Sequence, residues 1–171
     1  MSTTKSLETH QVDADQKDFR ESVEFFLFKE ARLMDSNSYQ AWLDLWDEKC
    51  TYWIPCNDED TDPNMHVSIL YCDRRMLENH VIRLIEGNAF AQSPKSRTLR
   101  TVTNIEAYRE GDNIKAYSNF MLAEVRGSQQ NIHAGRSEYE LREADSGFII
   151  QKKKVILLKL DKPQDNVTFL L

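Results

Sequence analysis

The stretch that decides the fold is residues 96–160, SRTLRTVTNIEAYREGDNIKAYSNFMLAEVRGSQQNIHAGRSEYELREADSGFIIQKKKVILLKL. Three strand-like segments, 96–108, 113–126 and 131–142, are followed by a fourth over 147–160. The links between them are rich in Gly, Asp, Asn and Ser, which tolerate positive φ or hydrogen-bond to their own backbone. Such a succession of segments predicts a long antiparallel meander.

The patterns typical of helices all lie before this meander. Apolar residues recur at spacings of three and four over 16–35, and a second, short helix is expected over 39–46. Residues 50–55 and 67–71 are rich in β-branched and aromatic residues and predict two strands, and a third helix is expected over 73–87. Helices followed by a large antiparallel sheet indicate an α+β domain rather than alternating βαβ units.

The two ends of the chain differ in character. Residues 1–14 are polar and unpatterned, which predicts a flexible arm before a single domain over 15–171. A polar elbow over 161–165 leads into an apolar end, residues 167–171. Because chain ends usually fray in water, an apolar end is expected to pack on the domain's own core or on a partner.

Composition excludes several classes of protein. The 171 residues suffice for one domain with a real core, and the net charge of −6 argues against nucleic-acid binding as a main function. No apolar segment is long enough to span a membrane, and the N-terminus lacks a secretory signal, so a cytoplasmic protein is expected. The three cysteines form no CxxC pair, which favours reduced, packed thiols.

The chain lacks the spacings that metal sites require. Its four histidines, His10, His66, His80 and His133, lie in separate segments, and no HxxxH, HExxH or CxxC motif is present. No catalytic, metal-binding or cofactor-binding residue is therefore expected in this chain.

One alternative remains open to a fold of this kind. Helices covered by a curved sheet can enclose a pocket in which a desolvated Asp and a Tyr or His carry out acid–base chemistry, as in a stand-alone isomerase or dehydratase. The residues to suspect are Asp35, Tyr39, Asp47, Tyr52 and His80. Each also has a structural interpretation, such as the end of a helix or a core aromatic, and a pure binding or transport module is a third possibility.

Several motifs together resemble one known family. They are EARLMD at 30–35, YQAWLDL at 39–45, YWIP at 52–55, SRTLRTVTN at 96–104, YSNF at 117–120, AGR at 134–136, and GFII at 147–150 before the lysines at 152–154. In order and spacing they resemble the small, or β, subunit of bacterial aromatic-ring-hydroxylating dioxygenases, over about residues 19–171. Leu99 and Lys152 depart slightly from that pattern.

The resemblance implies a fold, an assembly and a division of labour. It implies a cone-shaped fold of the nuclear-transport-factor-2-like or cystatin-like type, with N-terminal helices packed on a curved, mainly antiparallel sheet. It also implies a hexamer of three large (α) and three small (β) subunits with β–β contacts. The large subunit is expected to hold a Rieske iron–sulfur cluster (2Fe-2S) and a mononuclear Fe(II), fed with electrons from NADH through a reductase. The small subunit would be structural, in an enzyme acting on an aromatic carboxylate such as benzoate, anthranilate or salicylate.

Once partners are expected, five residues become candidates for subunit interfaces. An Arg on a strand that faces a neighbouring subunit can form bidentate hydrogen bonds with a carboxylate, which makes Arg97, Arg100 and Arg136 candidates. Ordinary surface charge is the other interpretation of each. In the apolar end, Phe169 and Leu170 are the expected interface residues.

Overall fold

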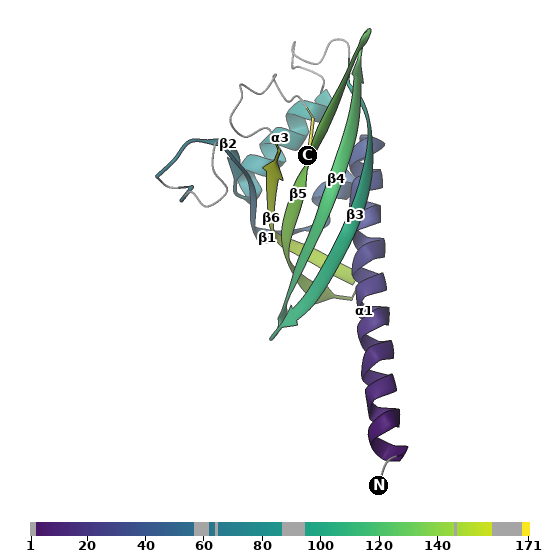
Figure 1. Cartoon of the computed structure of the whole chain (residues 1–171). Helices are drawn as coiled ribbons and strands as arrows, with labels where there is room; N and C mark the ends of the chain where they lie inside the picture. The colour runs from purple at the N-terminus through teal and green to yellow at the C-terminus, as the bar shows by residue number, and fades with distance from the viewer. Residues whose placement is uncertain (1–2, 57–61, 64, 87–94, 146, 159–168) are drawn as a thin grey trace.

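The part of the chain that the structure describes forms three helices and one six-stranded sheet (Figure 1). The computed structural model describes residues 3–56, 62–63, 65–86, 95–145, 147–158 and 169–171, with side chains from residue 15 onward. The elements in order are α1 Thr3–Asp35, α2 Tyr39–Leu43, β1 Trp46–Pro55, β2 Ser68–Cys72, α3 Arg74–Glu86, β3 Arg97–Glu110, β4 Asn113–Arg126, β5 Gln129–Ala144 and β6 Gly147–Leu157. Within this described part, no helix is both long and apolar enough to cross a membrane.

The sheet has the strand order β2-β1-β6-β5-β4-β3. Only β1 and β6 run parallel, and the other neighbours are antiparallel. The meander predicted over 96–160 is confirmed over 97–157 as the four strands β3 to β6, and residues 159–160 lie outside the described residues. Gly111 and Gly127, at φ of 62° and 59°, occupy the turns after β3 and β4, where this backbone conformation favours glycine.

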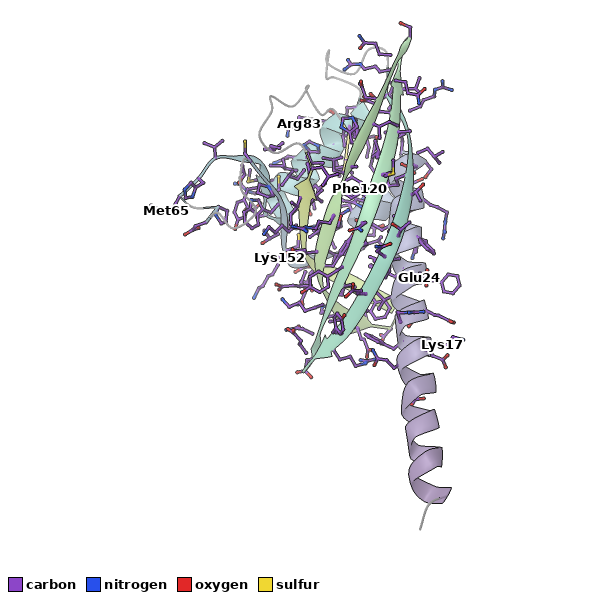
Figure 2. The ribbon with its side chains drawn as sticks, in the orientation of Figure 1. Lys17, Glu24, Met65, Arg83, Phe120 and Lys152 are labelled. Atoms are coloured by element: carbon purple, nitrogen blue, oxygen red, sulfur yellow. The ribbon has the colours of Figure 1, made fainter. Side chains whose placement is uncertain are left out.

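Helix α1 lies along one side of the strongly twisted sheet beside β3, and its N-terminal part extends past the end of the sheet (Figure 1). Its apolar stripe, which includes Phe19, Val23 and Leu27, is buried. Lys17 and Glu24 lie on the opposite side of the helix, away from the sheet (Figure 2). Helix α3 packs on α2 and β1. The described helices pack on one face of the sheet, and no helix among the described residues covers the other face, which we call the uncovered face.

The covered face of the sheet carries the core. In β4 every second side chain, from Ile114 to Leu122, is buried, and the residues between them are more exposed. Gly135 in β5 permits close packing with β6, because a Cβ at this position would lie 2.3 Å from the main-chain oxygen of Ile156. The isolated glycine inside a strand thus has a packing cause.

Several predicted boundaries differ from the structure. Helix α1 ends at Asp35 as predicted, but it begins at Thr3, so the predicted start at residue 16 is wrong. Residues 3–15 contain no Gly or Pro that would interrupt a helix. Helix α2 is shorter than predicted, because Trp46 already pairs with Ile150 as the start of β1. The link after β4 has two residues rather than five, since Gln129 pairs with Arg126.

Other predictions lie wholly or partly outside the described residues. The loops expected over 57–64 and 88–95 are described only at 62–63 and 95, and the elbow over 161–165 is not described. The flexibility assigned to residues 1–14 and the extent of the domain also stay predictions.

Candidate functional site

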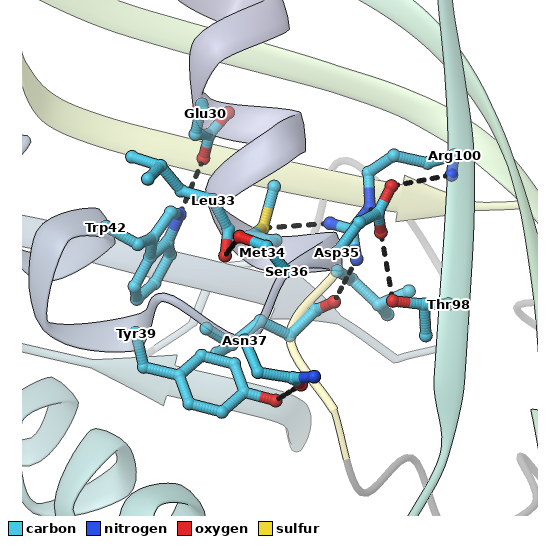
Figure 3. Close-up of polar contacts among 12 residues, drawn as sticks. Glu30, Leu33, Met34, Asp35, Ser36, Asn37, Tyr39, Trp42, Thr98 and Arg100 are labelled. Atoms are coloured by element: carbon cyan, nitrogen blue, oxygen red, sulfur yellow. Dashed lines mark hydrogen bonds and ion pairs between the residues drawn. The ribbon is translucent and has the colours of Figure 1, made fainter.

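The suspected carboxylates have separate structural partners. Asp35, at the end of α1, accepts hydrogen bonds from Thr98 Oγ1 at 2.9 Å and from the backbone N–H of Arg100 at 2.8 Å (Figure 3). Asp47, in β1, accepts one from Arg142 Nε at 2.6 Å. This hydrogen bond lowers the pKa of Asp47 below its ordinary value. Both carboxylates are therefore engaged in holding elements together.

The suspected aromatic and histidine side chains do not meet in one pocket either. Tyr39 donates a hydrogen bond to the side-chain oxygen of Asn37 (Figure 3). Tyr52 binds residue 171, and burial raises its pKa far above the ordinary range. His80 lies half-buried on α3, where burial lowers its pKa. The structure thus does not assemble the acid–base set that the sequence made possible.

Among the described residues, no group of three or more His, Cys, Asp or Glu side chains is placed to hold a metal ion. His133 Nε2 lies 3.3 Å from Glu124 Oε2, and the His133 ring packs edge-on against Phe169 at 5.4 Å between centroids. Burial tends to raise the pKa of Glu124, but hydrogen bonds from Ser96, His133 and Asn131 outweigh it and lower the pKa. The pair therefore joins two strands to the C-terminal residues.

The interior contains a charged network that the sequence did not predict. Glu30 of α1 accepts hydrogen bonds from Lys153 Nζ at 2.8 Å, Tyr139 OH at 2.9 Å and Trp42 Nε1 at 3.2 Å. Both Glu30 and Lys153 are only 1% exposed. Burial lowers the pKa of Lys153, and the nearby Glu30 carboxylate opposes that shift. The network ties α1 and α2 to strands β5 and β6.

A sequence signal existed for Glu30 but hardly for Lys153. Glu30 falls on the buried stripe of α1, between Leu27 and Met34. Lys153 stands inside a run of three lysines, which favours a solvated or subunit-facing strand end. A register shift between β5 and β6 reverses the alternation along β6, so that Ile150 and Lys153 both face the core. Such a shift has no signature in the sequence.

Residues 169–171 pack into the interior of the fold. Tyr52 OH donates to the main-chain oxygen of Leu171 at 2.6 Å, and Lys153 Nζ donates to the same atom at 3.0 Å. Phe169, Leu170 and Leu171 are 8%, 2% and 3% exposed. The cavity beside them is about 20 Å³, room for about one water, whereas ligand pockets are typically about 300–1,000 Å³. This cavity is therefore too small for a substrate.

The five predicted interface residues divide into two groups. Arg100 is turned inward, with its side chain 4% exposed: its Nε lies 2.8 Å from Asp35 Oδ1, and its Nη2 lies 3.1 Å from the main-chain oxygen of Leu170. Phe169 and Leu170 are likewise buried within this chain. Contact of any of these residues with a neighbouring subunit stays a prediction.

Arg97 and Arg136, by contrast, are exposed and border an apolar area on the uncovered face of the sheet. Leu99, Met121 and Ile132 are 72%, 59% and 51% exposed. The strand register places Leu99, Ala123 and Ile132 in one row across β3, β4 and β5, and Thr101, Met121 and Ala134 in the next row. We call these two rows the outer apolar face. Single exposed apolar residues are normal, but a contiguous group marks a contact surface.

The outer apolar face is bordered by charged side chains in one direction and by a groove beside α1 in the other. Farther along the strands it gives way to charged side chains, where Lys115 Nζ lies 2.7 Å from Glu140 Oε1. On the other side, Leu99 also lines an open groove of about 740 Å³ between α1 and β3, to which Phe28 and Leu33 contribute. The apolar surface therefore continues from the sheet to the edge of α1. Sequence alternation alone could not single out these positions as a contiguous area.

The chain is similar to known proteins along most of its length. Residues 29–160 match the model of the family described as ring hydroxylating beta subunit. The 2-halobenzoate 1,2-dioxygenase small subunit of Burkholderia cepacia is 37% identical over 138 residues, which cover 77% of this chain and 84% of that protein. The anthranilate 1,2-dioxygenase small subunit of Acinetobacter baylyi is 32% identical, covering 84% and 93%.

Solved structures agree with this assignment. The β subunit of the benzoate 1,2-dioxygenase from Burkholderia mallei superposes with a TM-score of 0.71 at 27% identity, covering 86% of this chain and 95% of that one. A nuclear-transport-factor-2-like protein with a cystatin-like fold from Novosphingobium aromaticivorans gives 0.58 at 13% identity, covering 100% and 98%, which supports the fold alone. The predicted fold class is confirmed.

The fold and the family match define the class: the chain is a β subunit of the ring-hydroxylating oxygenases. It belongs to the ring hydroxylating beta subunit family and is the non-catalytic component of an aromatic-ring-hydroxylating dioxygenase, whose β subunits partner with α subunits. The resemblance found in the sequence is confirmed, and the isomerase or dehydratase alternative is not supported.

Proposed function

We propose that this chain supports the assembly of catalytic α subunits in a multicomponent Rieske non-haem iron dioxygenase that hydroxylates an aromatic carboxylate. The observation that carries the proposal is the outer apolar face. Leu99, Met121 and Ile132 are more than half exposed and lie next to one another across β3, β4 and β5. A contiguous exposed apolar area of this kind fits contact with a partner protein.

The cofactors then belong to the partner. We propose that the α subunit holds the Rieske iron–sulfur cluster (2Fe-2S) and the mononuclear Fe(II), and that a reductase delivers electrons from NADH. Because NADH is a reductant of the cytoplasm, the complex would act there. This chain would contribute no ligand to either iron centre.

The assembly we propose is a hexamer of three α and three β subunits, in which the outer apolar face contacts the catalytic subunit. In a closed symmetric assembly every copy of a subunit uses the same surface. The outer apolar face on each of the three β subunits could therefore form the same contact with an α subunit. Arg97 and Arg136, at the two borders of this face, would supply polar contacts to partner carboxylates. We further propose that Arg100, Phe169 and Leu170 support subunit contacts through the placement of the C-terminal residues.

The substrate class follows from the named relatives. Those named above are subunits of dioxygenases named for 2-halobenzoate, anthranilate and benzoate, and others are subunits of dioxygenases named for p-cumate and toluate. All of these are aromatic carboxylates. We therefore propose that the complex containing this chain hydroxylates the ring of an aromatic carboxylate with O2.

Two matched substitutions test the proposed contact surface. Ile132 on the outer apolar face and Ile82 on α3 are 51% and 48% exposed, so Ile132→Glu and Ile82→Glu place the same charge at equally exposed sites. Each variant is co-expressed with the catalytic subunit, and affinity-tagged β subunit is used to pull the complex from the lysate. We expect Ile132→Glu to lose most of the co-purified catalytic subunit and Ile82→Glu to retain it. Equal recovery with both variants, each folded by circular dichroism, would refute the assignment of this face.

A further inference from the structure

Three strands direct hydrogen-bond donors at the main chain of residues 170–171. Tyr52 of β1 and Lys153 of β6 donate to the main-chain oxygen of Leu171, at 2.6 and 3.0 Å. Arg100 of β3 donates to the main-chain oxygen of Leu170 at 3.1 Å. The three donors are far apart in the sequence, and the sheet brings them together to form a binding site for residues 170–171.

The recognition is directed at the peptide backbone. The Tyr52 hydroxyl donates to the oxygen of Leu171 and also accepts from its backbone N–H at 3.1 Å. One side chain therefore satisfies both main-chain groups of one residue, as a neighbouring strand would. The interior thus has the hydrogen-bonding pattern of a site for a short extended peptide.

Two of these donors also pair with carboxylates of the same chain. Lys153 Nζ lies 2.8 Å from Glu30 Oε1, and Arg100 Nε lies 2.8 Å from Asp35 Oδ1. These pairs hold the two donors in place beside residues 170–171.

The side chains of the segment complete the fit. Phe169 packs on the ring of His133, and Leu170 and Leu171 are almost fully buried in the core. Apolar groups at three successive residues, joined by hydrogen-bonded carbonyls, define the ligand chemistry: a short apolar peptide. The cavity of about 20 Å³ beside Leu171 shows how nearly the segment fills its site.

We propose that the interior of the fold is a binding site for a short apolar peptide, and that residues 169–171 are its ligand within the same chain. A separate peptide with the same chemistry binds in trans when the chain's own segment is displaced. The site faces inward and is separate from the outer apolar face, so a peptide bound there would not occupy the surface proposed for the catalytic subunit.

The experiment empties the site in the full-length chain. The triple variant Phe169→Ala, Leu170→Ala, Leu171→Ala removes the buried side chains that hold the segment in place. Acetyl-Phe-Leu-Leu-amide is then titrated while thermal unfolding is followed by circular dichroism. We expect a saturable rise in Tm, or, where the variant is unfolded alone, recovery of the folded signal with added peptide. The wild-type chain, whose site is occupied, should show no such rise.

Two controls separate a specific site from general apolar binding. Acetyl-Phe-Asp-Leu-amide places a charge at the position of Leu170, which is 2% exposed, and should give no rise. Adding Tyr52→Phe to the triple variant removes both hydrogen bonds to residue 171 and should weaken peptide binding about tenfold. Absence of saturable binding at millimolar peptide, equal binding of the two peptides, or unchanged affinity with Tyr52→Phe would each overturn the proposal.

Discussion

The buried pair of Glu30 and Lys153 gives the sharpest test of how the interior is held together. Lys153→Met removes the 2.8 Å ion pair and the 3.0 Å hydrogen bond to Leu171. Among the described residues, the carboxylate of Glu30, which is 1% exposed, then keeps the neutral donors Tyr139 and Trp42 and no cation. Breaking a buried pair by removing one partner costs about 3–5 kcal/mol, because the remaining charge is uncompensated. We expect this loss in the free energy of unfolding.

The companion change Glu30→Gln should cost a similar amount, since it leaves Lys153 charged with fewer acceptors. In the double variant neither charge is left alone, so its loss should be smaller than the sum of the two single losses by about 1–3 kcal/mol. Urea unfolding of the isolated chain, followed by tryptophan fluorescence, measures all four proteins of this cycle.

A surface pair of similar length provides the control. Lys115 Nζ lies 2.7 Å from Glu140 Oε1, but their side chains are 29% and 37% exposed. Lys115→Met should therefore cost less than about 1 kcal/mol. If Lys153→Met costs no more than Lys115→Met, or if the two single losses add fully in the double variant, the interior network does not stabilise the fold as argued.

Three further outcomes are expected. The hydrogen bond from Arg142 lowers the pKa of Asp47 in the folded state, so the ionised carboxylate stabilises the fold at pH values above its unfolded pKa of about 3.9. This stabilisation is lost as the pH falls through the folded pKa. The urea midpoint should therefore fall below about pH 4, and it should fall less steeply for Asp47→Asn. Gly135→Ala places a methyl group 2.3 Å from the oxygen of Ile156 and should cost more than about 2 kcal/mol, seen as a lower Tm. Asp73→Ala removes the cap at the start of α3, where its Oδ1 accepts from a backbone N–H at 2.8 Å, and should cost about 1 kcal/mol in urea unfolding.

The meander was predictable because turn chemistry marks it locally. Gly111 and Gly127 occupy tight turns at positive φ, and the strands between such turns alternate between buried and exposed residues. Glycine and aspartate signals of this kind need no knowledge of distant residues. The end of α1 at Asp35 and the N-cap at Asp73 were predictable for the same reason.

What the sequence could not show depends on distant pairings. The burial of Lys153 follows from a register shift between two strands, and the inward turn of Arg100 follows from its contact with Asp35 at the end of α1. Likewise, an apolar end is equally typical of a core segment and of an interface, and only the contacts of Tyr52 with Leu171 show that it lies inside this chain. The outer apolar face appears only when three strands are aligned side by side.

This chain is a non-catalytic subunit, so the iron and the turnover of the enzyme should depend on its catalytic partner. The most direct measurement is the iron content and turnover of the chain purified alone, beside the same chain co-purified with its catalytic partner. We predict no stoichiometric iron and no oxidation of benzoate-type substrates by the isolated chain, and iron with O2- and NADH-dependent hydroxylation in the complex. Stoichiometric iron in the isolated chain, or turnover without the partner, would contradict the claim.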